Sequence, residues 1–144
     1  MKNTSSQNNT IDADEADYLY VQPSQIPKAG NGLFTAIEIY KDEIITLFKG
    51  EILDSNEAHK RAKQNNDRYF INLLNGTIMD SMHTDCFAKY ANDTKGSINT
   101  KFKNNAEITL DDNQNVCIKA TKKIKSGQEI FCGYGKAYWK KHQE

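Results

Sequence analysis

The chain has 144 residues, with 19 basic and 19 acidic side chains and therefore no formal net charge at pH 7. This length fits one domain with a core of its own, and the balanced charge argues against general attraction to nucleic acid or an anionic membrane. No apolar run approaches the roughly 20 residues that span a bilayer, and no signal-peptide pattern opens the chain. We therefore expect an intracellular protein, cytoplasmic or nuclear, in its own cell or in a host.

The first residues are polar and become acidic toward Asp17, without any periodicity. Such a composition is typical of disorder, so we predict a tail over residues 1–17 and a single domain over residues 18–144. The three cysteines, Cys86, Cys117 and Cys132, are far apart and form no CxxC pair. This spacing predicts neither a disulfide framework nor a metal site, and we expect Cys86 and Cys117 to pack as small apolar side chains.

From Tyr18 onward, short apolar runs are separated by turn residues, which predicts a mainly β domain of many short strands. The predicted strands are Leu19–Val21, Gly32–Ala36, Ile44–Phe48, Tyr69–Leu73, Thr77–Met79, Ala106–Leu110, Val116–Ala120 and Glu129–Phe131. The Asn75-Gly76 pair predicts a hairpin turn between two of them. No alternation of strands with helices suggests a doubly wound nucleotide-binding sheet.

Two helices are expected. The first runs over about Ser55 to Gln64, where Asp54 is a suitable N-terminal cap and Glu57 stands three residues later. Its exposed faces are polar, so it should lie on the surface. The second is a short helix around Lys136 to Lys141.

A pair of glycines flanks Asn31 just after Lys28, in the run Gly30-Asn31-Gly32. On its own the pair is explained by a tight turn between strands. The alternative is a turn whose bare backbone approaches a ligand. A second glycine pair flanks Tyr134, between Gly133 and Gly135, and suggests a phenol held at a cavity.

Four segments in order resemble the SET domain of protein-lysine methyltransferases. They are Lys28–Phe34, Phe48–Ile52, Ala88–Asp93 preceded by Asp80, and Glu129–Gly135. The similarity covers roughly Val21 to Trp139. It implies a β-clip type fold of several small sheets, with a C-terminal pseudoknot in which the last segment passes beneath a loop near Asn92.

The resemblance also implies a site for S-adenosylmethionine on one face and a channel for a substrate lysine on the other. Tyr134 corresponds to the catalytic tyrosine. The implied cofactor-binding residues are Lys28, Gly30, Asn31, Gly32, Asn92, Asp93, Tyr134 and Trp139. The implied channel residues are Phe48, Phe131, Cys132 and Tyr138, and no metal is implied.

This chemistry suits the residue types. A free lysine amine has a pKa of about 10.4, so neutralising it at pH 7 costs roughly 4.6 kcal/mol. An aromatic, desolvating channel and a nearby cation both lower that pKa, and the enzyme then mainly orients the reactants. The expected partner is a protein that presents a lysine, with no direct binding of nucleic acid or membrane.

The chain departs from the family pattern at several positions. Asp93 stands where the family has histidine, Lys89 where it has arginine, and Phe48 where it has tyrosine. Cys132 stands where a larger aromatic often limits the number of methyl groups added, so we expect more than one methyl to be possible, unless neighbouring bulk such as Phe131 or Phe70 fills the space.

Two other functions stay open at this point. One is a non-catalytic module of the same fold that binds a peptide or the cofactor, which Asp93 and Phe48 favour. The other is an unrelated β-rich interaction domain. The acidic residues near Asp14 and at Asp111 could attract a basic peptide such as a histone tail, or could simply keep the protein soluble.

Overall fold

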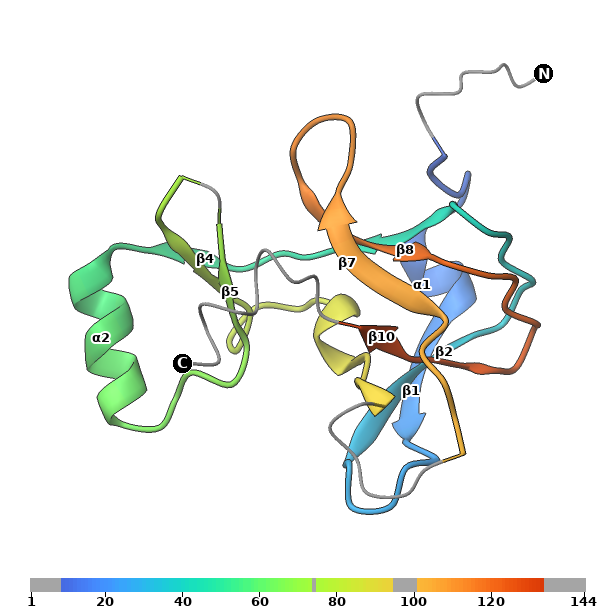
Figure 1. Cartoon of the computed structure of the whole chain (residues 1–144), viewed down its shortest axis with the longest axis horizontal. Helices are drawn as coiled ribbons and strands as arrows, with labels where there is room; N and C mark the ends of the chain where they lie inside the picture. Colours follow the sequence, from blue (N-terminus) through green and yellow to red (C-terminus); the bar gives the residue numbers. More distant parts are fainter. Residues whose placement is uncertain (1–8, 74, 95–100, 134–144) are drawn as a thin grey trace.

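The computed structural model describes residues 9–73, 75–94 and 101–133 of the chain (Figure 1). Three small sheets dominate it, with short helices between them, which confirms the prediction of a mainly β fold. In chain order the elements are α1 (Glu15–Tyr18), β1 (Leu19–Pro23), β2 (Asn31–Thr35), β3 (Ile44–Leu47), β4 (Glu51–Leu53), α2 (Ser55–Lys63), β5 (Phe70–Asn72), β6 (Ile78–Asp80), the 3-10 helix η1 (Ala88–Tyr90), β7 (Ala106–Leu110), β8 (Val116–Ala120), β9 (Glu129–Ile130) and β10 (Cys132–Gly133).

Every predicted strand has a counterpart among these elements. Two strands were not predicted: β4, which is three residues long and has Ile52 57% exposed, and β10, which is two residues long. β4 has only two apolar residues between Glu51 and Asp54, and β10 ends in a glycine, so neither forms an apolar run of its own. The expected helix around residues 136–141 lies outside the described residues.

Two of the sheets form the main body of the molecule. One has the order β1-β2-β9 and the other β10-β7-β8-β3. Their neighbouring strands pair antiparallel, except for β10, which pairs parallel with β7. The parallel pair brings the C-terminal end of the described chain into the middle of the fold.

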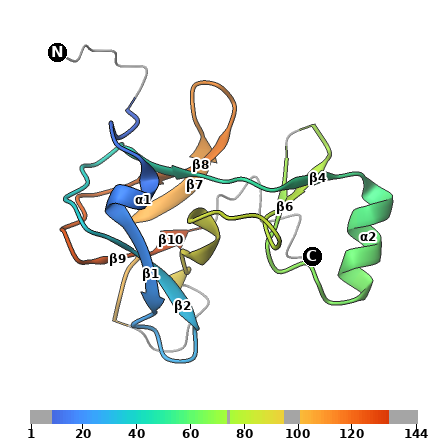
Figure 2. The same cartoon turned by 180° about the vertical axis from the view of Figure 1, so that it is seen from behind.

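The third sheet, in the order β4-β6-β5, projects to one side of this body together with α2, as both views show (Figures 1 and 2). The hairpin between β5 and β6 turns at Gly76, whose φ of 92° requires glycine, as the Asn75-Gly76 pair predicted. The cap of α2 is also confirmed, because Asp54 Oδ1 accepts a hydrogen bond of 2.9 Å from the Glu57 amide.

An arginine joins α2 to this sheet. The Arg61 guanidinium donates to Asp80 Oδ2 at 2.8 Å, to Glu51 Oε1 at 2.9 Å and to Glu57 Oε2 at 2.9 Å. The Asp80 side chain is only 1% exposed, so Arg61 supplies the charge that compensates a buried carboxylate. The third sheet and α2 are therefore held together by charge as well as by the small apolar cluster of Leu53, Ala58 and Phe70.

The N-terminal boundary differs from the prediction. Residues 9–17 were expected to be part of a disordered tail, but Glu15–Tyr18 form α1, and Ile44 donates its amide to Asn9 O at 3.0 Å. Tyr18 Oη donates to Ile45 O at 2.7 Å, and Glu15 accepts the Leu47 amide. The segment thus covers the free edge of β3, which would otherwise leave backbone groups unpaired.

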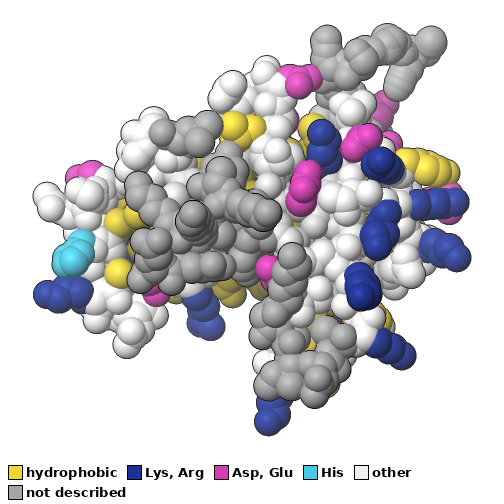
Figure 3. Space-filling model, in the orientation of Figure 1, with side chains coloured by type: hydrophobic (Ala, Val, Ile, Leu, Met, Phe, Trp, Pro, Cys, Tyr) yellow, Lys and Arg dark blue, Asp and Glu magenta, His cyan; other side chains and the backbone are white. Residues whose placement is uncertain are grey.

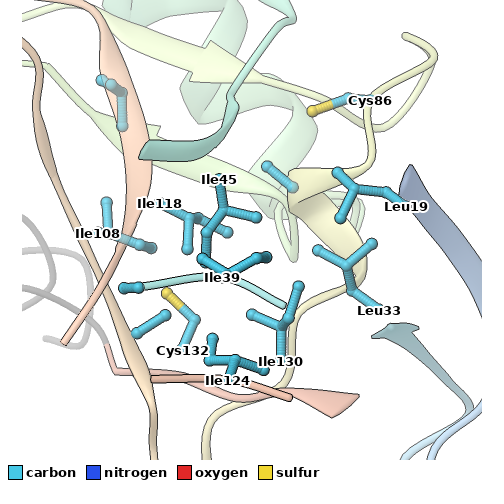
Figure 4. Close-up of a cluster of buried hydrophobic side chains, with 14 of the residues drawn as sticks. Leu19, Leu33, Ile39, Ile45, Cys86, Ile108, Ile118, Ile124, Ile130 and Cys132 are labelled. Atoms are coloured by element: carbon cyan, nitrogen blue, oxygen red, sulfur yellow. The ribbon is translucent and has the colours of Figure 1, made fainter. Parts of the chain in front are cut away.

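The main core lies between the two larger sheets (Figure 4). Leu33, Ile45, Ile118 and Ile130 point into it from four different strands, and each is completely buried. The three cysteines are buried and unpaired, and Cys86 and Cys132 belong to this cluster. No disulfide therefore constrains the fold.

The C-terminal segment runs between two other parts of the chain. The Cys132 amide donates to Asn92 O at 2.8 Å, while Phe131 O accepts the amides of Asn105 and Ala106 at 2.9 and 3.0 Å. Both flanks of the stretch from Asn92 to Asn105 therefore hold the same segment. This is the arrangement expected from the implied C-terminal pseudoknot.

On the face that Figure 3 shows, charges of both signs are present, and basic side chains gather on the side where β8 ends and the turn after it begins. None of the described helices is long and apolar enough to cross a membrane.

Candidate functional site

The loop between β1 and β2 presents bare backbone to open space. Lys28 and Gly30 both have positive φ angles, 67° and 73°, and Ser24 donates its amide to Gly30 O at 2.8 Å to close the loop. A Cβ added to Gly30 would meet no atom within 4 Å. Gly30 is therefore required by its backbone conformation, and it leaves room for a ligand next to the main chain.

A buried acid holds this loop. Glu129 is 1% exposed, and its carboxylate accepts the Ser24 hydroxyl at 2.7 Å and the Gln25 amide at 2.8 Å. A Cβ on Gly32 would collide with that carboxylate. The absence of a side chain at residue 32 is thus explained by Glu129, independently of any ligand.

Asn92 connects the loop to the C-terminal segment. Its Nδ2 donates to Asn31 O at 3.0 Å, and its own carbonyl accepts the Cys132 amide. It follows η1 directly after Ala91, so the 3-10 turn sets where the side chain starts. Segments that are far apart in the sequence meet at this one residue.

Asp93 has a different neighbour. Its Oδ1 accepts a hydrogen bond of 2.9 Å from Asn104 Nδ2, while Asn104 Oδ1 accepts both the amide and the hydroxyl of Thr94 at 2.9 Å. Residue 133 is a glycine, which leaves room for the Asn104 side chain. A Cβ on Gly133 would lie 3.0 Å from Asn104 Nδ2. The aspartate at the family's histidine position is therefore tied into the loop that follows it.

A cavity of about 340 Å³ opens where these segments meet, within the size range of small-molecule sites. Five of the residues predicted from the sequence line it: Gly30, Asn31, Phe48, Asn92 and Cys132. They come from four separate stretches of the chain.

The other predicted residues are placed differently. Lys28, Gly32 and Asp93 do not line this cavity, and neither does Phe131, which is 3% exposed and stacks on Phe102 with ring centroids 5.1 Å apart. Phe70 packs in the cluster beside α2 and does not fill the space next to Cys132. Tyr134, Tyr138 and Trp139 lie outside the described residues.

The cavity also contains residues that the sequence did not single out as site residues, namely Tyr69, Tyr90, Lys89 and Arg68. Lys89 Nζ donates to three carbonyls, those of Ser81, Met82 and Thr84, at 3.0 to 3.2 Å. It also lies 5.5 Å from the ring centroids of Tyr69 and Tyr90. Tyr90 lies two residues before Asn92, and this closeness to a predicted site residue could have identified it as part of an aromatic wall.

Cys132 contributes a neutral, compact side chain to the wall. The residue is 1% exposed, and burial raises the pKa of its thiol well above the usual range, with Asp93 and Glu107 adding to the effect. A thiol that stays protonated is a poor nucleophile and a poor metal ligand. Among the described residues no group of three or more His, Cys, Asp or Glu could hold a metal ion.

A second cavity, of about 660 Å³, shares Tyr90 with the first. The N-terminal segment from Thr10 to Tyr18, β3 and the stretch from Asp85 to Phe87 form its walls. None of the predicted site residues lines it, so the smaller cavity is the candidate site.

Comparisons with known proteins agree with this picture. A family model described as SET domain matches residues 30–135. The chain is 27% identical over 146 residues to the histone-lysine N-methyltransferase EZH2 of Chaetomium thermophilum, an alignment that covers 94% of this chain and 9% of that protein. It is 37% identical over 76 residues to the histone-lysine N-methyltransferase mes-2 of Caenorhabditis elegans, covering 51% of this chain and 10% of that protein. The chain thus spans about a tenth of the length of these relatives.

Two solved structures share the fold. One is ctPRC2 in an autoinhibited conformation bound to S-adenosylmethionine, with a TM-score of 0.69 and 25% identity over 88% of this chain and 16% of that one. The other is a humanized mutant of the Chaetomium thermophilum Polycomb Repressive Complex 2 bound to the inhibitor GSK126, with a TM-score of 0.68 and 24% identity over 82% of this chain and 15% of that one.

Proposed function

The chain belongs to the SET-domain family, and from that premise we propose that it transfers methyl groups from S-adenosylmethionine to the side-chain amine of lysine in a protein substrate. The observation that carries the proposal is the single cavity that collects Gly30, Asn31, Phe48, Asn92 and Cys132. The relatives support it, since both are named histone-lysine N-methyltransferases and one solved neighbour is bound to S-adenosylmethionine.

The cavity residues fit this cofactor. The backbone at Gly30 has open space beside it, and Asn92 Oδ1 has no hydrogen-bond partner among the described residues, so it can accept from the methionine ammonium. When bound, the cofactor supplies a methyl group activated on a sulfonium ion. In this proposal Asn31, Asn92, Tyr134 and Trp139 contact the cofactor. Glu129 and Asn104 fix Gly32 and Asp93, the chain neighbours of Asn31 and Asn92.

The aromatic residues receive the lysine. Phe48, Tyr69 and Tyr90 line the cavity, and their rings exclude water from an amine that must be neutral to react. Desolvation lowers the pKa of a lysine amine toward neutral pH, which reduces the roughly 4.6 kcal/mol that deprotonation costs in water. In this proposal the hydroxyl of Tyr134 aligns the amine, and Cys132 leaves room for methyl groups already added.

The substrate proposed is a protein with an accessible lysine, histones being one candidate. The protein would then act in the compartment that holds that substrate. No binding of nucleic acid is needed for the reaction.

The test compares the wild-type chain with Tyr134→Phe, using labelled S-adenosylmethionine with core histones and with a cell lysate. We expect protein labelling by the wild type and a loss of at least about tenfold in Tyr134→Phe, because misplacement of the reactants by about 1 Å can cost on the order of a hundredfold in rate. Tyr40→Phe is the matched control, since Tyr40 is 52% exposed and lines no described cavity. Equal labelling by all three proteins would remove Tyr134 from its role.

A thermal-shift titration separates catalysis from the alternative of a binding module. A ligand that binds only the folded state raises the melting temperature with its concentration. Stabilisation by S-adenosylmethionine without any protein labelling would favour the non-catalytic module. A chain that neither binds nor transfers would contradict both functions.

A further inference from the structure

The described walls of the candidate site carry two cations and no carboxylate. Arg68 and Lys89 line the cavity, and none of the other described lining residues is Asp, Glu, Lys, Arg or His. A cavity proposed to receive a cationic cofactor and a lysine is thus positive on the sides that the structure describes. The two cations differ in what balances them.

Lys89 is fully engaged within the protein. Three backbone carbonyls accept hydrogen bonds from its ammonium at 3.0 to 3.2 Å, which uses all three of its donors. The rings of Tyr69 and Tyr90 lie against it. Lys89 therefore has no donor left for a ligand.

Arg68 is not engaged in this way. It is exposed, and no carboxylate of a described residue lies within 4.0 Å of its guanidinium, whereas Arg61, the other arginine of the chain, contacts three. Its guanidinium makes no ion pair with a described residue and lies over the Tyr69 ring, whose centroid is 5.5 Å from Arg68 Cζ. A free arginine on an open surface is ordinarily just hydrated, but this one lies at the edge of a cavity and against an aromatic wall.

The Tyr69 ring is a neighbour that the Arg68 guanidinium shares with Lys89. It contacts both cations, each at 5.5 Å from its centroid. A guanidinium held against a ring keeps its N–H edges available, and those edges match a carboxylate in a two-point hydrogen bond. We propose that Arg68 binds a carboxylate at the solvent-facing edge of this cavity.

Two sources of that carboxylate are compatible with the proposed function, on which this inference rests. One is the methionine carboxylate of S-adenosylmethionine. The other is an acidic side chain next to the target lysine in the protein substrate. Both make the same contact, and they are separated by experiment.

The experiment measures binding by calorimetry for the full chain and for three variants, Arg68→Gln, Arg68→Lys and Lys63→Gln. Lys63 is an exposed cation at the end of α2 that lines no described cavity, so it is the matched control for loss of one positive charge. Four ligands are used: S-adenosylmethionine, its decarboxylated analogue, and two lysine peptides that differ only in Glu or Gln beside the lysine. Melting temperatures check that each variant is folded.

If the cofactor supplies the carboxylate, Arg68→Gln weakens the binding of S-adenosylmethionine by about fivefold or more. The binding of the decarboxylated analogue stays unchanged. If the substrate supplies it, the wild type prefers the Glu peptide, Arg68→Gln removes that preference, and cofactor binding is unchanged. Arg68→Lys should fall between wild type and Arg68→Gln in either case, because it keeps the charge and loses the two-point geometry.

Arg68→Gln behaving like Lys63→Gln with all four ligands would overturn the inference. If that result came with normal methyl transfer, only this inference would fail and the proposed function would stand. A wild-type chain that bound none of the four ligands would overturn both.

Discussion

The carboxylate of Glu129 occupies the space in which a side chain at residue 32 would stand. A Cβ built on Gly32 lies 2.9 Å from Glu129 Cδ and closer still to one carboxylate oxygen. The same carboxylate accepts hydrogen bonds from Ser24 and Gln25 in the loop that leads to Gly30. One buried acid thus links β9 to the loop that borders the cavity.

This relationship predicts that Gly32→Ala destabilises the fold by about 1–3 kcal/mol, because the added methyl overpacks a site already filled. Urea unfolding measures the change. In a Glu129→Ala background the same substitution should cost clearly less, since the colliding group is gone. Additive costs of the two substitutions would contradict the proposed collision.

The Arg61–Asp80 pair predicts a loss of stability when the arginine is removed. Arg61→Met leaves the buried Asp80 carboxylate without its cation, and we expect the melting temperature to fall by roughly 5–10 °C. Lys60→Met, on the exposed side of the same helix, should change it by about 1–2 °C at most. Asp80→Asn combined with Arg61→Met should recover part of the loss, and no recovery would argue that packing by the arginine dominates.

The buried thiols predict a loss of stability at alkaline pH. Burial raises the pKa of Cys117 from its ordinary value of 9.0 to about 11, and that of Cys132 also rises well above 9.0. Both thiols stay neutral in the folded chain after they ionise in the unfolded one. Their contribution to stability is therefore fully present below about pH 9 and is lost as the pH rises from there toward 11, by up to about 1.4 kcal/mol per pH unit for each thiol.

Urea unfolding at pH 8, 9 and 10 measures this effect. Cys132→Ala should flatten the decrease above pH 9, since it removes one of the two groups. A free energy of unfolding that stays constant from pH 8 to pH 10 would contradict the buried-thiol explanation.

The size of Cys132 predicts the product of the proposed reaction. It lines the cavity with a compact side chain, so we expect the wild type to add more than one methyl group to a lysine. Cys132→Phe should fill that space and shift the product to monomethyl-lysine, as read by mass spectrometry at long times with excess cofactor. Cys117→Ala is the control, because Cys117 is buried in β8 and lines no described cavity. Wild-type product that stops at one methyl would contradict the prediction.

Much of the fold was readable from local patterns. Short apolar runs between turn residues located every strand longer than three residues, the Asn75-Gly76 pair located a hairpin, and Asp54 located the start of α2. Each of these signals depends on a few neighbouring residues. For residues 9–17 the local composition predicted disorder, whereas the structure shows contacts with β3. Polar composition does not reveal such contacts.

The sequence by itself determined the family, because four short motifs in the right order, around Gly30, Phe48, Asn92 and Tyr134, are specific together. It could not decide which of those residues share a cavity. The tertiary structure brought Gly30, Phe48, Asn92 and Cys132 together around one cavity. It placed the Glu129 carboxylate against Gly32 and the Asn104 amide in a hydrogen bond with Asp93. It left Arg68 without a carboxylate among the described residues. The physical reason is that these are contacts between residues eleven or more positions apart, set by sheet pairing and by the path of the C-terminal segment between Asn92 and β7.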